Sequence, residues 1–396
     1  MPDPYIATPF KKDMIPCDFA SEYEIITYYI RPSTSVIIIK SKETGDKYVV
    51  KFLHIIGEKY SFKQNSINIE IEQLFSAFLT EKILDKNVSP HIIRCHQSDR
   101  PCDGLDILIK KLVNRECPTR KERINNDIDN DWAKNYCDIV NRVQSGVLKD
   151  SYKSIIVQYW GTNFGSYIKN NKYIQKLSDA EHYMRDSIHR IVEENIDTIM
   201  FQIIFTLAAI RSKYHGFSHG NLSNNNVVID TVKNYQENEY CSYHIRGKTF
   251  YMKCNGPHAK LIDFRYSKIA EGKVGTETEG LGMDDVYGDI CEYELCEKKS
   301  DYSDTWAIIC GTIWRLTDTQ CDSCHLVANM LEKYANMEFF DESIRIVMKY
   351  STSSYVDGLD IVMKSVMTPE QYIDSDIFDR FSTKPSNADI IHSFNK

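Results

Sequence analysis

The pattern of apolar positions divides the chain into a strand-rich first part and a helix-rich second part. Three short runs of β-branched and aromatic residues lie near the start, at residues 23–30, 35–39 and 47–53. The last two runs are separated by the sequence Glu-Thr-Gly-Asp, which favours a tight turn. We therefore expect three antiparallel strands in succession.

A helix is expected after these strands, over residues 67–84, because apolar residues recur there with the 3.6-residue period of one buried face. It should end before Pro90, since proline disfavours helical backbone in the residue that precedes it. Further strands are expected at residues 91–95, 106–112 and 154–160.

Two polar segments interrupt the pattern of apolar positions, and we interpret them as insertions. Residues 113–153 are polar and charged, which predicts a surface excursion. From residue 161 onward the pattern is mainly helical, apart from a second polar insertion at 230–258. The chain therefore predicts a tail at residues 1–20, a strand-rich lobe at 21–160 and a mainly helical lobe at 161–396.

Composition narrows the class of protein. The chain has 396 residues, of which 42% are hydrophobic and 26% charged, enough for a two-lobed folded protein. The net charge of −8, without a stripe of Lys and Arg, indicates no nucleic-acid partner. The most apolar stretch, residues 199–210, would be a helix about 18 Å long, too short to cross a bilayer.

The first residues carry no pattern typical of a signal peptide, so we expect a soluble protein of the cytoplasm. In that reducing compartment, the 12 cysteines should be free thiols. This expectation includes Cys321 and Cys324, whose spacing also matches half of a zinc site.

Four polar motifs follow one another along the chain. Lys51 ends the run Tyr-Val-Val-Lys in the third expected strand, and Val36 lies in the strand before it. The expected helix carries Glu70 and, on a neighbouring face, Glu72 as the alternative candidate. Taken singly, a lysine on a strand or a glutamate on a helix is usually a solvated surface charge.

The other two motifs lie in the helix-rich part. Residues 219–226 are His-Gly-Asn-Leu-Ser-Asn-Asn-Asn, just after an apolar helix expected at 196–213. Residues 260–265 are Lys-Leu-Ile-Asp-Phe-Arg, a short apolar strand that ends in Asp263.

In this order the motifs resemble those of the protein kinase family. The run ending in Lys51 is similar to the family's Val-Ala-Ile-Lys strand, residues 219–226 to its His-Arg-Asp-Leu catalytic loop, and residues 263–264 to Asp-Phe-Gly. Residues 303–306, Ser-Asp-Thr-Trp, resemble the start of the family's central C-lobe helix. The resemblance implies an α+β fold of two lobes, a β-rich N-lobe with one key helix and a mainly helical C-lobe.

The long excursion between the catalytic loop and Asp-Phe-Gly also resembles the divergent kinases and pseudokinases of large DNA viruses, of the poxvirus and giant-virus kind. Their excursion is β-rich, so the resemblance implies further strands in the insertion at 230–258. The chain's richness in Asn and Ile fits AT-rich coding. This resemblance implies a viral protein located in the host-cell cytoplasm or the virion.

The resemblance implies a site for Mg²⁺ and ATP. Lys51 would hold the α- and β-phosphates and be oriented by an ion pair with Glu70. Asn226 and Asp263 would hold Mg²⁺ between the phosphates. Asp304 would have a structural role, accepting hydrogen bonds from the backbone of the catalytic loop.

The same resemblance implies three further nucleotide-binding residues. They are Val36 beside the phosphate-binding strands, Val157 at the gatekeeper position, and Tyr159 in the hinge strand.

Three departures from the family pattern bear on activity. Asn221 stands where the family has its catalytic base Asp, and an amide can accept a hydrogen bond but cannot take the proton. Residues 29–36 occupy the glycine-rich loop and contain no glycine. Arg265 replaces the glycine of Asp-Phe-Gly, and Gly220 replaces the arginine of His-Arg-Asp.

These departures favour a weak kinase or a pseudokinase that scaffolds or regulates a protein partner. The alternative is an active serine/threonine kinase that transfers the γ-phosphate of ATP to protein substrates and tolerates Asn221. A third possibility is a small-molecule kinase of the aminoglycoside or choline type, which the His-Gly start of the loop suggests. The Ser-Asp-Thr-Trp segment argues against this third possibility.

Overall fold

The structure is a computed structural model that describes residues 23–30, 34–54, 72–96, 152–179, 182–269, 295–319, 321–349, 361 and 364–396. Three expected features lie outside the described residues: the tail at 1–20, the strand at 106–112 and nearly all of the insertion at 113–153. The described residues form two compact units. The first lies within residues 8–77 and 94–159, and the second within 78–93 and 160–396.

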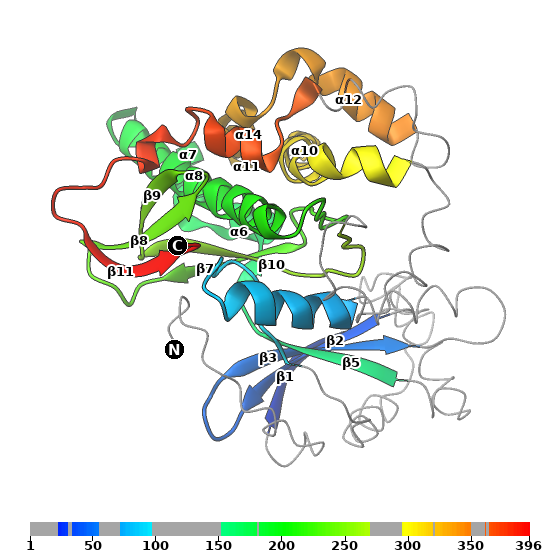
Figure 1. Cartoon of the computed structure of the whole chain (residues 1–396). Helices are drawn as coiled ribbons and strands as arrows, with labels where there is room; N and C mark the ends of the chain where they lie inside the picture. The colour runs from blue at the N-terminus through cyan, green and yellow to red at the C-terminus, as the bar shows by residue number, and fades with distance from the viewer. Residues whose placement is uncertain are drawn as a thin grey trace, which may run out of the picture. The chain divides into compact units, whose positions relative to one another are not determined.

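The first unit is built on a five-stranded antiparallel sheet in the order β1-β2-β3-β5-β4. Four of these strands, β1, β2, β3 and β5, are labelled in Figure 1. Its strands are β1 (Tyr23–Ile30), β2 (Thr34–Ser41), β3 (Lys47–His54), β4 (Cys95–His96) and β5 (Tyr152–Gln158). The three expected successive strands are therefore confirmed. The strand expected at 91–95 is reduced to two residues, and β5 lies two residues earlier than expected.

A helix follows at residues 72–79 and continues as a π-helical turn over Thr80–Leu84. It ends before Pro90, as the sequence predicts, while its expected first residues, 67–71, lie outside the described residues. One face of this helical segment is buried, including Phe75, Leu79 and Ile83.

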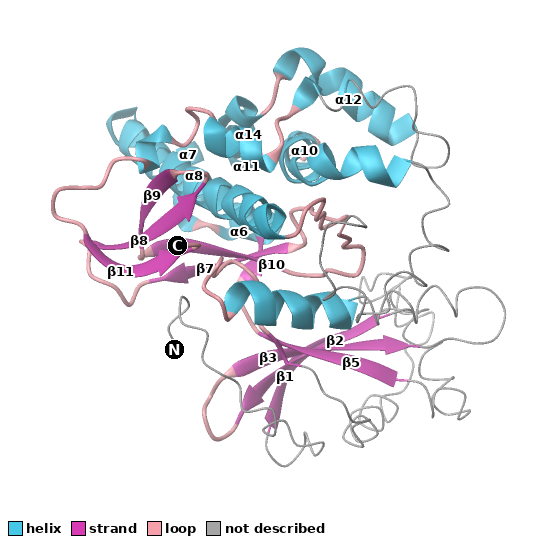
Figure 2. Cartoon of the chain, viewed as in Figure 1, coloured by secondary structure: helices cyan, strands magenta, loops and turns pink. Residues whose placement is uncertain are grey.

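The second unit is mainly helical (Figure 2). Its helices are α6 (Phe164–Asn170), α7 (Lys172–Asp179), α8 (His182–Lys213), α10 (Leu295–Thr317), α11 (Asp322–Leu331), α12 (Met337–Lys349) and α14 (Pro369–Asp374), with 3₁₀ turns at Glu332–Tyr334 and Asp379–Phe381. The expected apolar helix is the buried second half of α8. The Ser-Asp-Thr-Trp segment lies inside α10 and not at its start, because the helix already begins at Leu295.

Two three-stranded sheets complete the second unit. The strands are β6 (Thr162–Asn163), β7 (Val227–Val232), β8 (Glu239–Ile245), β9 (Lys248–Lys253), β10 (Gly256–Leu261) and β11 (Asp389–Phe394). One sheet has the order β10-β7-β6 and is antiparallel. The other has the order β11-β8-β9, with β11 parallel to β8. The strands expected in the 230–258 insertion are thus β8 and β9, which form a hairpin.

A strand-rich first unit and a mainly helical second unit confirm the expected α+β class. None of the described helices is long and apolar enough to cross a membrane. Cys321 and Cys324 form a disulfide, contrary to the expectation of free thiols there. Cys95, Cys241, Cys254 and Cys310 are buried thiols that form no disulfide.

Candidate active site

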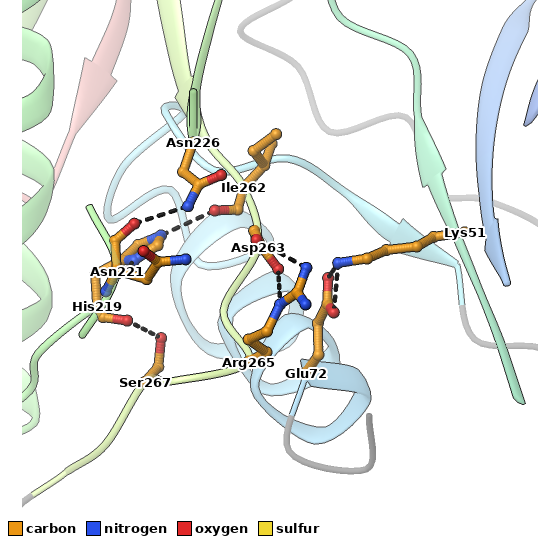
Figure 3. A network of polar contacts seen from close by, with 9 residues as sticks. All are labelled: Lys51, Glu72, His219, Asn221, Asn226, Ile262, Asp263, Arg265 and Ser267. Carbon is orange, nitrogen blue, oxygen red and sulfur yellow. Dashed lines mark hydrogen bonds and ion pairs between the residues drawn. The ribbon is translucent and has the colours of Figure 1, made fainter. Parts of the chain in front are cut away.

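The motif residues fall on both units, and the first unit carries a buried ion pair between Lys51 and Glu72 (Figure 3). The Nζ of Lys51 lies 2.8 Å from Oε1 and 2.7 Å from Oε2 of Glu72. Both side chains are largely shielded, with 14% and 6% of their surface exposed. The ammonium group of Lys51 is therefore held by both carboxylate oxygens at once.

This pairing corrects the partner expected for Lys51. The ion pair assigned to Glu70 is made by Glu72, and Glu70 itself lies outside the described residues. The negative charge of Glu72 also affects Cys95, whose thiol pKa is raised to about 12 by burial first and by this carboxylate second.

The sheet of the first unit places the other predicted nucleotide-binding residues around Lys51. Val36 lies directly opposite Lys51 in the β2–β3 register, and Val157 lies opposite Val49 in the β3–β5 register. The backbone N–H of Tyr159 donates to the carbonyl of Lys47 at 3.1 Å, just beyond the end of β5. Contact of these residues with a nucleotide stays a prediction.

In the second unit, Asp304 holds the backbone of the segment after α8. Its Oδ2 accepts from the N–H of His219 at 2.6 Å, and its Oδ1 accepts from the N–H of Gly220 at 3.0 Å. Only 4% of Asp304 is exposed, so both charge-assisted bonds are shielded from water. The hydrogen bonds expected between Asp304 and the loop backbone are therefore present.

His219 ties this loop to the segment that contains Asp263. Its Nε2 lies 2.9 Å from the carbonyl oxygen of Ile262, which can only accept, so Nε2 carries the proton. Its Nδ1 is then the acceptor for the N–H of Asn221, at 3.4 Å. The Ser267 hydroxyl donates to the His219 carbonyl at 3.1 Å, and the imidazole packs on the Phe264 ring with centroids 4.9 Å apart.

Gly220 has no room for a side chain. Its φ is +74°, and a Cβ atom built on it would lie 2.1 Å from the carbonyl oxygen of Tyr266. An arginine like that of His-Arg-Asp therefore cannot stand here without moving the backbone of one of the two segments.

Strand register brings Asn226 next to Asp263. β7 and β10 pair so that Val227 lies opposite Leu261, and the N–H of Ile262 donates to the Asn226 carbonyl at 3.0 Å. The Nδ2 of Asn226 donates to the carbonyl of Asn221 at 2.7 Å. The three residues expected to take part in chemistry in this unit are thus joined through one hydrogen-bonded loop (Figure 3).

Asp263 is bound by Arg265, two residues further along the chain. The Nε of Arg265 donates to Oδ1 at 2.7 Å and its Nη2 donates to Oδ2 at 3.1 Å, so both carboxylate oxygens are engaged (Figure 3). Asp263 has a φ of +68°, the left-handed conformation that few residues other than glycine adopt. Such backbone strain is typical of functional sites.

Comparison with known proteins shows which proteins the chain is similar to. No protein-family model matches the chain. A "putative serine/threonine-protein kinase" of Acanthamoeba polyphaga mimivirus is 27% identical over 370 residues, which are 92% of this chain and 90% of that protein. The chain is similar, over nearly its whole length, to a putative viral protein kinase.

Two further comparisons concern the same kind of protein. A second mimivirus protein of the same description is 22% identical over 251 residues, covering 61% of the kinase-like chain and 47% of that protein. A solved crystal structure of a kinase domain aligns with a TM-score of 0.33 and 16% identity, covering 69% of the chain and 58% of that domain. The α+β assignment rests on the strands and helices of the chain itself.

The metal ligands expected in the kinase-like chain do not fit Mg²⁺ as they are arranged. A magnesium ion prefers oxygen ligands from one or two carboxylates and water. Both oxygens of Asp263 are instead bound by a guanidinium group, which leaves the amide of Asn226 as the other expected ligand. Within the described ranges, no three His, Cys, Asp or Glu residues gather in a way that could hold a metal ion.

Sequence reasoning identified most of these positions but missed two contacts. Glu72 is the alternative to Glu70 as the partner of Lys51, and the sequence does not give the direction of its side chain. Arg265 stands out in the sequence as the replacement of the family's glycine, but its bond to Asp263 depends on the left-handed backbone of Asp263. That backbone conformation has no clear signal in the sequence.

Proposed function

We propose that the chain is an ATP-binding, kinase-like protein with weak or no phosphotransfer that regulates or scaffolds a protein partner. The observation that carries this proposal is the shielded ion pair between Lys51 and Glu72. A lysine on a strand of an exposed sheet face needs no buried partner, whereas one that binds phosphates must be held in a fixed position.

Asn221 supports the second half of the proposal. Hydrogen bonds hold the loop around Asn221 in place. Asp304 accepts from the loop backbone, and the Asn226 side chain donates to the Asn221 carbonyl. The side chain at the position of the base is nonetheless an amide, which cannot accept a proton at neutral pH. General-base catalysis typically contributes about 10²- to 10⁴-fold, so phosphotransfer should be slow.

ATP binding by Lys51 is tested by calorimetry on the full chain and on Lys51→Ala. We expect the substitution to weaken ATP binding at least tenfold, because it removes the ammonium group and leaves the Glu72 carboxylate to repel phosphate. The matched control is Lys42→Ala, which removes an exposed lysine from the turn after β2. Equal affinities for the parent and Lys51→Ala would contradict the proposed site.

An active serine/threonine kinase is the second candidate function. It is supported by the intact Asp304 contacts and by the described function of the two mimivirus relatives. Because the transition state of phosphoryl transfer is largely dissociative, the acceptor hydroxyl needs orientation more than deprotonation. The amide of Asn221 could supply that orientation.

The remaining features of the proposal follow from the resemblance. The partner or substrate is a protein. Mg²⁺ is the metal that the resemblance assigns to Asn226 and Asp263, although Arg265 already binds both carboxylate oxygens of Asp263. The mimivirus relatives support a viral protein. Its action in the host-cell cytoplasm or the virion is what the resemblance to viral kinases implies.

A further inference from the structure

We propose that Arg265 is a built-in counter-ion that takes the place of a divalent metal at Asp263, so that ATP binding does not require Mg²⁺. The part that concerns ATP rests on the proposed function above. The part that concerns the metal rests on the second unit alone.

The contact between the two side chains is a two-point one. The guanidinium group donates from Nε to Oδ1 and from Nη2 to Oδ2, the paired geometry that arginine forms with carboxylates and lysine cannot. The pair is partly buried, with 26% of the Arg265 side chain and 14% of the Asp263 side chain exposed. A metal ion at these oxygens would have to compete with both bonds and lie close to the positive guanidinium group.

The backbone holds the pair in this arrangement. Phe264, the residue between them, is fully buried and packs on His219. Asp263 takes the left-handed conformation, while Arg265 is not among the described residues with positive φ. The glycine of the family pattern is thus not needed at position 265, and the side chain there can turn back to the carboxylate without strain.

Charge explains why this contact would change the metal requirement. A bare carboxylate repels the phosphates of ATP, and in the family a divalent cation lies between them. Arg265 cancels the charge of Asp263 permanently, so phosphate would meet a neutral pair. Mg²⁺ is also reluctant to exchange its water ligands, which makes a carboxylate already bound by arginine a poor site for it.

The first experiment measures metal binding without nucleotide. Mn²⁺, which gives a paramagnetic resonance signal when free, is titrated into the parent chain, Arg265→Gln and the double variant Arg265→Gln/Asp263→Asn. We expect Arg265→Gln to bind Mn²⁺ at least tenfold more tightly than the parent, and the double variant to lose that gain. Equal Mn²⁺ binding by the parent and Arg265→Gln would overturn the proposal.

A second arginine–aspartate pair offers a matched control. Arg246 also binds both oxygens of its partner, Asp374, but on the exposed surface. Arg246→Gln should leave Mn²⁺ binding at the parental level. A gain in Arg246→Gln as large as that in Arg265→Gln would mean that any freed carboxylate binds Mn²⁺, and would overturn a special role for Asp263.

The second experiment measures ATP affinity by calorimetry in Mg²⁺ and in EDTA. We expect the affinities of the parent to agree within about threefold, whereas Arg265→Gln should bind ATP at least tenfold more tightly with Mg²⁺ than without it. A tenfold loss of parental binding in EDTA would overturn the proposal. If the parent binds no ATP under either condition, the proposed function fails, and the Mn²⁺ titration still decides the role of Arg265.

Arg265→Lys guards against misfolding of Arg265→Gln. It keeps one positive charge and loses the two-point contact, so its Mn²⁺ affinity should lie between those of the parent and Arg265→Gln. Parental Mn²⁺ affinity in a folded Arg265→Lys, as judged by its thermal unfolding, would contradict the need for the two-point contact.

Discussion

At the scale of single residues, Asn221 is held by its backbone and not by its side chain. Its carbonyl accepts from Asn226 at 2.7 Å, and its N–H donates to the imidazole of His219 at 3.4 Å. The side chain takes no part in either bond. Its chemistry can therefore be changed without disturbing the loop.

Asn221→Asp should raise phosphate transfer from ATP at least tenfold, because it restores a carboxylate at the position of the base. The assay follows transfer of the γ-phosphate to a generic protein substrate and to the chain itself. Asp263→Asn serves as the inactive reference for both the parent and the variant.

The result also separates the two candidate functions. Parental transfer that disappears in Asp263→Asn would show an active kinase that tolerates Asn221. If Asn221→Asp gains activity only when Arg265→Gly is added, the main defect lies at Arg265. No gain in either case contradicts Asn221 as the cause and directs attention to the glycine-free segment at 29–36.

Residue identities within the motifs could be predicted because each motif has a fixed spacing. Asn226, Asp263 and Asp304 occupy positions that the resemblance to kinase motifs assigns. The structure has the expected hydrogen bonds of Asp304 to the loop backbone, and further hydrogen bonds link Asn226 to Asn221 and to Ile262, the residue before Asp263. The choice of Glu72 over Glu70 could not be predicted, since a helix of uncertain start has no fixed rotation about its axis. The Arg265 contact depends on one backbone angle, the φ of Asp263.

At the scale of elements, the sheet β11-β8-β9 depends on the last strand of the chain. β11 pairs with β8 in parallel, and the backbone N–H of Asn395 donates to the carbonyl of Asn87 at 2.8 Å. Phe394 is the buried residue of β11, with 2% of its surface exposed, and its ring lies 5.3 Å from that of Tyr243.

Phe394→Ala should lower the free energy of unfolding by about 3–5 kcal/mol, the usual cost of emptying a buried phenylalanine site. The urea midpoint of the parent and the variant, at equal slope, measures it. Asp389→Ala changes an exposed residue of the same strand and should cost less than about 0.5 kcal/mol. A cost below about 1 kcal/mol for Phe394→Ala would show that β11 adds little to stability.

Strands that pair with neighbours in sequence were predictable, and β11 was not. The alternation in β1, β2 and β3 and the turn between β2 and β3 fix those strands locally. β11 has a partner 150 residues earlier, at Glu239 for Asp389, and no local pattern reports such a distant pairing. The expected start of α10 at the Ser-Asp-Thr-Trp segment is wrong. The residues from Leu295 to Asp301 are mostly polar, so their sequence does not indicate that the helix begins before this segment.

At the scale of the whole chain, two buried histidines make stability depend on pH. His91 donates from Nδ1 to the Ala259 carbonyl at 2.9 Å, and its Nε2 lies 3.1 Å from the Tyr243 hydroxyl. Burial lowers the pKa of His91 to about 3, and burial also lowers that of His258, which packs against it, well below its ordinary value. Both rings are therefore neutral in the folded protein at neutral pH.

Acidification from pH 7 to 5.5 should lower the free energy of unfolding by about 1 kcal/mol for each of these histidines. In the unfolded chain both imidazoles take up a proton below about pH 6.5. In the folded protein the pKa of His91 is lowered to about 3 and that of His258 lies well below its ordinary value, so stability falls as the pH falls below about 6.5. Urea midpoints at pH 7, 6 and 5.5 measure the loss.

His91→Gln tests the assignment, because glutamine can donate to Ala259 and accept from Tyr243 but does not titrate. This variant should lose about 1 kcal/mol less than the parent over the same pH range. His215→Gln removes an exposed histidine and is the control. An unchanged pH dependence in His91→Gln would mean that acid destabilisation arises elsewhere.

The parallel pairing of β8 with β11 also sets an order of events during synthesis. The β8–β9 hairpin leaves the ribosome about 150 residues before its third strand, since Glu239 pairs with Asp389. At about 5–20 residues per second, the free edge of β8 waits about 8–30 s for that strand. An unpaired edge of this kind is a site for pairing with other chains. The nascent protein is thus prone to aggregate in that interval. Slower translation in the host would lengthen the interval.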